Sequence, residues 1–545
     1  MAAEDSKRLA INASIVMGAT ILSRITGFVR ETLIPAKYGF SRVTDVYDVA
    51  FKFPDLMFNL LIGGAVSAAL VPVISGSLSK GEEKEGWESV SRFMNTIMVI
   101  MAGVCIAGSI FSKELVTMLA DGWNPDNPEH LEMILVASRL TRVLFPSVAF
   151  LMLAAFSNSV LYSYQRFASA ALGPTLYNVL CILSIMFLSN QNPDDYYGVD
   201  RVVYGVMFSS LAYFLFQLRF AFKNIKDNFV FKLGLFHKGF QRVFKLAVPS
   251  MISSSVIQIN TMVTARFASR FAEGSIAAVR SADRTWQMPL GIIAQSMGVA
   301  LLPSLSGKIA NGDKEGYKKS LAQGVRSVLL LTIPCAAAFI VLNKMIMRTL
   351  FQNSMRVTEG DIGLTAIVLV FYSTSLITQS FNTILTRAFY ACNETKLPMM
   401  TGVGIIILNI VLSVAFYNLT PIGVGGMALA YSVSSFVNTV LLVKLLTKRF
   451  SGLRLTEGMA KFIGSVVIAS VVMSAALICY SALVPASFIV GGFSIGLKLR
   501  QFLTLGVAVC LGAGVYFLVI SRMKIEEVAL IAGMVKSRFK RFKRK

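Results

Sequence analysis

The sequence has little charge and almost no histidine. Asp, Glu, Lys and Arg make up 15% of its 545 residues, whereas soluble domains carry about 25%. Only two residues are histidine, which leaves little material for a zinc site or a histidine-based catalytic centre. The apolar fraction, 55%, is high at the same time. Together these figures exclude a water-soluble globule and a disordered chain.

Cysteine pairing is absent as well. The six cysteines lie far apart, most of them in apolar runs, and no CxxC pair exists. The pattern excludes a disulfide-stapled secreted protein and predicts buried thiols that act as small apolar residues. The chain also lacks a Walker A loop. We therefore predict a protein that is not an enzyme, with no cofactor and no metal.

Long apolar segments are what the sequence has in abundance. A bilayer core of roughly 30 Å needs about 20 apolar residues per helix. The predicted fold class is thus an all-α integral membrane protein with fourteen transmembrane helices. The segments are 11–38, 44–76, 92–111, 131–163, 168–189, 198–221, 243–271, 279–306, 320–349, 360–391, 397–417, 423–446, 461–483 and 500–521.

The net charge of +23 is distributed by loop. Segments 219–245 and 522–545 carry seven and nine basic residues against one and two acidic ones, whereas 112–129 and 190–200 are acidic. The positive-inside rule then places both termini in the cytoplasm. We expect the basic tail to lie against anionic lipids of the inner leaflet, and we expect no nucleic-acid partner.

The chain contains an internal repeat. Residues 69–75 read ALVPVIS and residues 300–306 read ALLPSLS, each at the end of the second span of a six-span unit. Matching ends on the same side predict parallel repeats. We expect two pseudo-symmetric six-helix lobes around a central cavity, with two helices appended. The predicted domains are 1–225, 226–455, 456–524 for the last two spans, and a basic cytoplasmic tail at 525–545.

Charges inside the spans need a reason, because each costs roughly 2.5–3.5 kcal/mol at a helix centre. They concentrate in the first two spans of the first lobe and in the second span of the second lobe. One alternative is that some lie near the periplasmic interface or form ion pairs that join helices. The other is a polar cavity with surplus positive charge, which would attract an anion, and phosphate suits arginine best. The charged residues concerned, with the amide residues that accompany them in the same spans, are Arg24, Arg30, Glu31, Asp45, Asp48, Lys52, Asp55, Asn59, Arg280, Asp283, Arg284, Gln287 and Gln295.

Several of these residues stand in motifs that resemble a known family. The motifs are SRITGFVRE at 23–31, FKFPDL at 51–56, ALVP at 69–72, GPTLYN at 173–178, ADR at 282–284 and LPSLS at 302–306. They are similar to the MurJ (MviN) lipid II flippase family of the multidrug/oligosaccharidyl-lipid/polysaccharide exporter (MOP) superfamily. The resemblance covers essentially the whole chain.

The resemblance implies a fold, an activity and a site. The implied fold has two six-helix lobes, and its two C-terminal helices form a lipid-facing groove. The implied activity moves the undecaprenyl-pyrophosphate-linked peptidoglycan precursor across the bacterial cytoplasmic membrane, from inner to outer leaflet, by alternating access. Arg24, Arg30 and Arg284 match family arginines implicated in headgroup binding, and Asp45 matches an acidic cavity residue. The full predicted substrate site is Arg24, Arg30, Glu31, Asp45, Lys52, Asn59, Asp283 and Arg284.

Two departures from the family keep alternatives open. Many members carry arginine where this chain has Phe58-Asn59, so its cavity is less charged. A flippase for another lipid-linked oligosaccharide, of O-antigen or teichoic-acid precursor type, therefore remains as an alternative. A different class of alternative is a non-catalytic scaffold for cell-wall synthases, which would use the basic tail and loops. Some members also have acidic residues where this chain has Asn260, Asn409 and Ser413. The missing carboxylates argue against a sodium site there and leave the coupling ion open.

Overall fold

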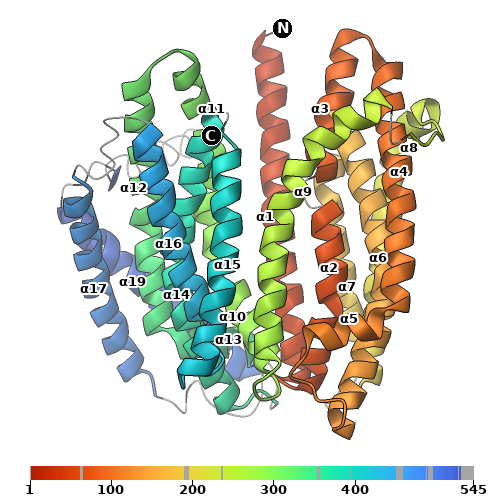
Figure 1. The fold of residues 1–545 in the computed structure, drawn as a ribbon. Helices are drawn as coiled ribbons and strands as arrows, with labels where there is room; N and C mark the ends of the chain where they lie inside the picture. Colours follow the sequence, from red (N-terminus) through yellow and green to blue (C-terminus); the bar gives the residue numbers. More distant parts are fainter. Residues whose placement is uncertain are drawn as a thin grey trace. The chain divides into compact units, whose positions relative to one another are not determined.

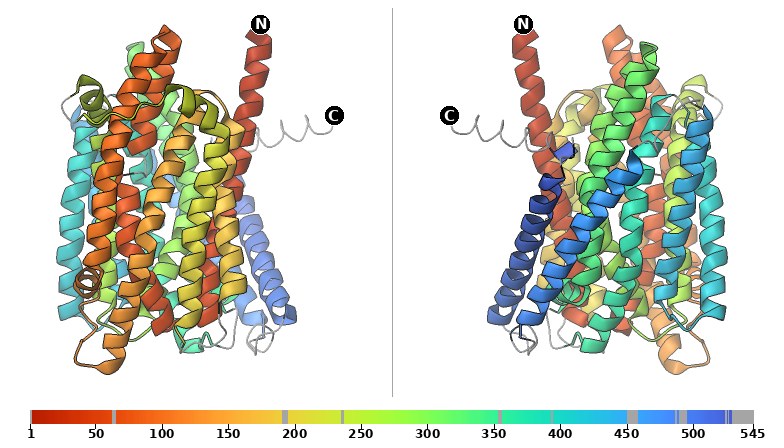
Figure 2. Two further views of the ribbon diagram at one scale, coloured as in Figure 1. Left: turned by 90° about the vertical axis from the view of Figure 1, so that its right-hand side faces the viewer. Right: turned by 90° about the vertical axis from the view of Figure 1, so that its left-hand side faces the viewer.

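The computed structural model describes residues 2–61, 65–189, 195–234, 237–352, 356–392, 394–449, 458–485, 488, 495–523, 525 and 527–528. The regular structure in these ranges is helical, and no strand occurs among them (Figures 1 and 2). The predicted tail at 525–545 and the pair Gly63-Gly64 lie almost wholly outside the described residues.

The long apolar segments are confirmed as helices. In the described part of the chain, eleven helices are long and apolar enough to cross a membrane. They are α4 (Glu83–Ile110), α6 (Pro128–Ser163), α7 (Phe167–Leu188), α8 (Tyr197–Asn228), the run Ser275–Ala310, α12 (Lys314–Val341), α14 (Glu359–Ala391), α15 (Lys396–Leu419), α16 (Gly425–Arg449), α17 (Met459–Leu483) and Gly496–Arg522 within α19 (Ile495–Arg522).

The other three predicted spans are helical too. They fall in α1 (Ala2–Tyr38), in the pair α2 (Arg42–Leu61) and α3 (Ala65–Lys80), and in α9 (Lys238–Ala268). The predicted span 44–76 falls in α2 and α3, and residues 62–64 between them lie outside the described residues. The count of fourteen spans stays a prediction.

Two short helices lie where the sequence did not predict separate ones. The predicted span 320–349 ends at Val341 and is followed by a separate short helix, α13 (Asn343–Phe351). At this junction the Asn343 side chain donates to the carbonyl of Ile340 at 2.6 Å, a local bond that competes with helix continuation. The acidic loop predicted at 112–129 likewise contains a short helix, α5 (Ser112–Leu119).

The same helix order occurs in both halves. α4 and α12 each have 28 residues and end at one non-helical residue, Phe111 or Leu342, before the short helices α5 and α13. Earlier in each half, a glycine with positive φ precedes a proline by the same number of residues, namely Gly39 before Pro54 and Gly274 before Pro289. The repeat seen in the sequence thus extends to local structure.

Residues 1–277 form the first compact unit. In it α6 packs against α2, α3, α4, α5 and α8, while α7 packs against α1 and α8. The neighbouring helices α4, α6 and α8 can be followed in Figure 1. A hydrophobic core of this unit contains buried aromatic side chains from α4, α6 and α9, namely Trp87, Phe93, Phe156 and Phe240. α9 packs against α2, α3 and α4 of this unit, although it follows the predicted domain boundary at 225.

Residues 278–545 form the second compact unit. α14 packs against α11 (Ser296–Ala310), α12, α13 and α16, and α17 packs against α12 and α19. Small polar side chains line the contact between α14 and α16. The hydroxyls of Ser375 and Ser432 are 2.6 Å apart, and those of Thr378 and Ser435 are 2.7 Å apart. Small residues let helix backbones approach closely in lipid, and their hydroxyls bond across the contact.

Removing one hydroxyl from this contact should destabilise the second unit measurably. Ser435→Ala removes the bond to Thr378 and should cost about 0.6 kcal/mol, and at most about 1.7. The measurement is the melting temperature of the purified protein in detergent. Ser434→Ala is the matched control, because the buried Ser434 hydroxyl has no hydrogen-bond partner among the described residues. Equal shifts for both variants would contradict the role of the contact.

The last helix is fixed to its unit by polar contacts at both ends. Near its start, Lys498 Nζ donates to the carbonyl of Thr349 at 2.6 Å, at the end of α13. Further along, the Tyr516 hydroxyl donates to the carbonyl of Leu330 on α12 at 2.6 Å. Beyond the helix, Glu527 pairs with Arg326 at 3.4 Å. The α17–α19 pair is therefore bonded to α12 and α13 and does not rest on apolar packing alone.

Candidate functional site

The first unit holds Arg30 in a defined position on α1. Its Nη2 lies 2.6 Å from Glu31 Oε1, and its guanidinium carbon lies 5.5 Å from the ring centre of Tyr177 on α7. The side chain of Arg30 keeps 25% of its surface exposed. A cation held by a carboxylate and an aromatic face is desolvated on one side and can bind a ligand on the other.

The contact between α1 and α7 explains the motif at 173–178. Asn178 Nδ2 donates to the carbonyl of Ser23 at 3.1 Å, and a Cβ on Gly27 would lie only 3.3 Å from that nitrogen. Gly27 thus lets the two helices approach, and Tyr177 then faces Arg30. Sequence reasoning quoted this motif but assigned no role to Tyr177 or Asn178.

The remaining predicted site residues of the first unit lie on α1 and α2. Arg24 is exposed one and a half turns before Arg30 on α1. Lys52 is half-buried on α2, which continues through Pro54 as a helix. The half-buried Asn59 donates from Nδ2 to the carbonyl of Asp55 at 2.8 Å, a bond within its own helix.

Asp45 has a structural role that its sequence position did not indicate. It is almost fully buried at the start of α2. Its Oδ2 accepts from the backbone N–H of Gly274 at 2.7 Å, and its Oδ1 accepts from that of Ala277 at 2.9 Å. Those N–H groups open α10 (Ser275–Pro289), and the first N–H groups of a helix lack partners inside it. Asp45 therefore caps α10 from another helix, and a direct contact with cargo stays a prediction.

The second unit contains Asp283 and Arg284 on α10. The two Asp283 carboxylate oxygens accept from Trp286 Nε1 at 3.0 Å and from Gln287 Nε2 at 2.7 Å. Trp286 is buried and stacks on Tyr372 of α14, with ring centres 5.9 Å apart. Arg284 is exposed beside this fixed carboxylate. The geometry thus holds Asp283 still and leaves the Arg284 side chain toward the surface.

The helix that carries these two residues is irregular just beyond them. After Pro289, residues Leu290–Gln295 form a π-helical turn before α11 begins. Proline lacks an N–H and disturbs the regular ladder, and π-helical turns are frequent at functional sites. The helix is therefore widened directly after Pro289.

The three residues weighed as a cation site lie in different units. Asn260 is half-buried on α9 in the first unit, whereas Asn409 and Ser413 are buried one turn apart on α15 in the second. Across the described ranges, no group of three His, Cys, Asp or Glu side chains could hold a metal ion. The doubt about a sodium site of this type stays a prediction.

An ion-pair cluster joins the α5–α6 connection to α9. Asp121 lies 2.9 Å from Arg266 Nε and 2.6 Å from Arg270 Nη2. Gly122 beside it leaves no room for a side chain, because a Cβ there would lie 2.3 Å from the carbonyl oxygen of Ser269. Partial burial raises the pKa of Asp121, but the hydrogen bonds from Arg270 and Arg266 outweigh it, so the net pKa is lowered.

The lowered pKa predicts acid-sensitive stability. A carboxylate with a depressed native pKa contributes its full stability above the ordinary Asp pKa of about 3.9 and loses it as pH falls through the native value. Asp121→Asn should therefore melt below wild type at neutral pH, and the difference should shrink in acid. Asp126→Asn, in the same exposed loop, is the control. A difference that stays constant to low pH would disprove the role of the ionised pair.

Comparisons with known proteins point to one family. A family model described as "Lipid II flippase MurJ" matches residues 36–498. A Buchnera aphidicola (subsp. Acyrthosiphon pisum) protein named "Probable lipid II flippase MurJ" is 31% identical over 462 residues, covering 83% of this chain and 86% of the relative. A Burkholderia cenocepacia protein named "Lipid II flippase MurJ" is 29% identical, covering 80% and 83% respectively.

Solved structures share the fold. A structure of "Lipid II flippase MurJ, inward closed conformation" matches with a TM-score of 0.73 and 24% identity, covering 93% of this chain and 98% of that one. An inward-facing MATE family multidrug transporter of the MOP superfamily matches with a TM-score of 0.65 and 15% identity, covering 82% and 98% respectively. At these identities the likeness concerns the fold alone.

Proposed function

The chain belongs to the lipid II flippase MurJ family, and on that premise we propose that it moves lipid II from the inner to the outer leaflet of a bacterial cytoplasmic membrane. The cargo is the undecaprenyl-pyrophosphate-linked peptidoglycan precursor. The observation that carries the proposal is the placement of Arg30 within a predicted span, fixed by Glu31 and Tyr177 and still partly exposed. A pyrophosphate is the ligand that this arrangement suits.

In the proposed mechanism, Arg24, Arg30 and Arg284 bind the pyrophosphate while Lys52 and Asn59 contact the rest of the headgroup. A guanidinium presents a planar fork of donors that matches phosphate oxygens. Glu31 competes with the cargo for Arg30, since both are anionic, so cargo binding must displace part of an existing ion pair. That competition limits affinity, and a carrier needs such a limit in order to release its cargo.

The finer architecture belongs to the proposal. We assign two six-helix lobes, at 1–225 and 226–455, that rock about a central cavity, with fourteen spans in all and both termini cytoplasmic. The helices of 456–524, α17 and α19, would form the groove that keeps the lipid tail in the membrane. The matching helix order of the two halves supports the repeat. Anionic lipids at the tail and cell-wall synthases remain proposed partners.

The test is complementation in cells that depend on this gene. Arg24→Ala, Arg30→Ala and Arg284→Ala should each impair growth and reduce lipid II in the outer leaflet. Normal growth and normal outer-leaflet lipid II in all three variants would refute the assignment. Rescue of an O-antigen or teichoic-acid precursor pathway, without rescue of lipid II export, would point to the alternative cargo.

A further inference from the structure

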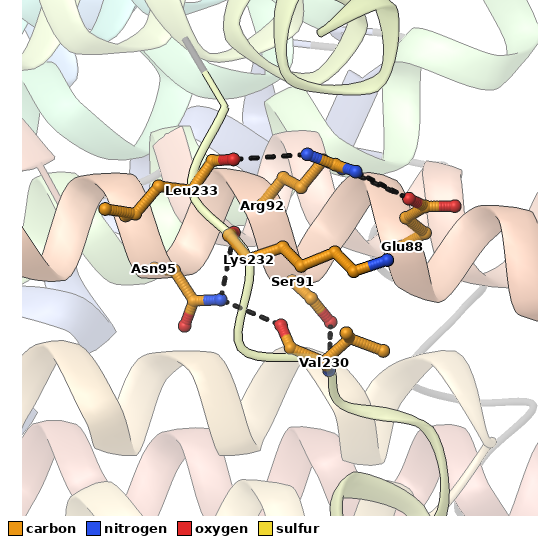
Figure 3. A network of polar contacts seen from close by, with 7 residues as sticks. All are labelled: Glu88, Ser91, Arg92, Asn95, Val230, Lys232 and Leu233. Carbon is orange, nitrogen blue, oxygen red and sulfur yellow. Dashed lines mark hydrogen bonds and ion pairs between the residues drawn. The ribbon is translucent and has the colours of Figure 1, made fainter.

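The connection between α8 and α9 is held along α4 although it belongs to no helix. Figure 3 shows residues 229–234 passing α4 with their backbone bonded to its side chains. Val230 N donates to Ser91 Oγ at 3.1 Å. Asn95 Nδ2 donates to the carbonyls of Val230 at 2.8 Å and Lys232 at 3.2 Å. We call residues 229–234 the strap.

A fourth bond fixes the end of the strap. Arg92 Nη1 donates to the carbonyl of Leu233 at 3.1 Å, and Arg92 is itself held by Glu88 at 2.8 Å (Figure 3). The chain passes so close here that a Cβ on Gly234 would lie 2.9 Å from Arg92 Nη1. Since α4 side chains bond to four backbone groups of residues 230–233, the strap has a fixed path.

This fixed path presents large apolar side chains outward. Phe231 is 86% exposed and Leu233 is 62% exposed. Phe231 packs edge-on against Phe229, whose ring in turn contacts Phe156 of the core. Val230 beside them is exposed as well, and exposed apolar residues that lie together, unlike single ones, mark a surface that a membrane or another protein covers.

The charges around the strap indicate that a lipid surface covers it. The end of α8 and the strap carry exposed basic side chains at Arg219, Lys223, Lys226 and Lys232, against one exposed acid, Asp227. The neighbouring acid on α4, Glu88, is already paired with Arg92. The charged last part of α8, residues 223–227, ends the apolar run of that helix. The strap lies beside the part of α4 where the apolar run of α4 begins. The strap is therefore level with a membrane surface. Apolar side chains flanked by lysines are what an anionic lipid surface attracts.

We propose that the strap is a membrane-surface anchor, which inserts Phe231 and Leu233 among the headgroups of an anionic leaflet while the nearby lysines contact lipid phosphates. Phosphatidylglycerol is the matching lipid chemistry, in preference to a zwitterionic lipid. The proposal concerns how the protein contacts the membrane surface, and it stands whether or not lipid II is the cargo.

Quenching of a tryptophan by brominated lipid tests the anchor. Phe231→Trp in the full-length protein is reconstituted in nanodiscs that contain equal fractions of brominated phosphatidylglycerol or brominated phosphatidylcholine. We expect quenching by the anionic lipid to be about twofold stronger. The three native tryptophans, Trp87, Trp123 and Trp286, are buried, and the wild-type protein supplies their background.

Matched variants separate charge from apolar contact. The control variant is Phe187→Trp on α7. Phe187 is 77% exposed and has no basic neighbour in sequence, so both lipids should quench a tryptophan at this position equally. Lys223→Gln with Lys226→Gln should remove the preference at position 231. Leu233→Trp repeats the test if Phe231→Trp lowers the melting temperature. Quenching by neither lipid, or equal quenching by both at positions 231 and 233, would overturn the proposal.

Discussion

Arg30→Ala is expected to reduce lipid II export strongly. The variant removes a guanidinium that Glu31 and Tyr177 hold within a predicted span. Hydrogen bonds to charged groups contribute about 1.5–3 kcal/mol each, which corresponds to roughly a 10- to 100-fold loss of cargo affinity. Transport measured by labelling of outer-leaflet lipid II should fall accordingly, while the amount of protein in the membrane stays near wild type.

Arg30→Lys distinguishes phosphate recognition from charge alone. Lysine keeps the positive charge but lacks the planar fork that binds two phosphate oxygens at once. It should restore only part of the lost transport. Asn178→Ala, which removes the bond to Ser23 while leaving Arg30 in place, should cost less than Arg30→Ala. Full activity of Arg30→Ala at normal expression would remove Arg30 from the binding site.

Asp45→Ala is expected to lower both stability and transport, whereas Asp45→Asn should retain much of each. The carboxylate accepts from two N–H groups at the start of α10, and loss of a helix cap costs about 0.5–2 kcal/mol. Asparagine is a good cap and keeps one acceptor oxygen, so it preserves one of the two bonds. Melting temperature and outer-leaflet lipid II are the two measurements.

The comparison of alanine with asparagine separates two roles of Asp45. If the residue acts by its negative charge, toward a proton, an ion or the cargo, both variants fail alike, because both are neutral. If it acts by capping α10, asparagine exceeds alanine in melting temperature and transport together. Identical loss of transport in the two variants, with asparagine as stable as wild type, would contradict the capping role.

Sequence reasoning found most helices because a membrane span is a local property. Twenty apolar residues in a row identify a helix without any knowledge of its neighbours, and eleven such helices are confirmed in the described part of the chain. The break between α12 and α13 was missed because Leu342 carries no proline or glycine signal. The strap was missed for a related reason, since residues 229–234 read only as part of a basic loop.

The site residues show the limit of the same reasoning. Arg30 attracted attention because charge is costly in an apolar helix, but its partner Tyr177 lies on another helix and carries no local signal. Asp45 was grouped with the cavity residues because it is a charge inside a predicted span and matches an acidic cavity residue of the family. Its bonds go to Gly274 and Ala277, more than two hundred residues away, and no periodicity in α2 reveals them.

Translocation of lipid II by the purified protein tests the central claim most directly. The full chain is reconstituted in vesicles with fluorescent lipid II, and a membrane-impermeant reagent measures how much reaches the opposite leaflet. The account predicts that wild type exposes lipid II far faster than protein-free vesicles do, and that Arg30→Ala does not. Equal rates for wild type, Arg30→Ala and protein-free vesicles would contradict it.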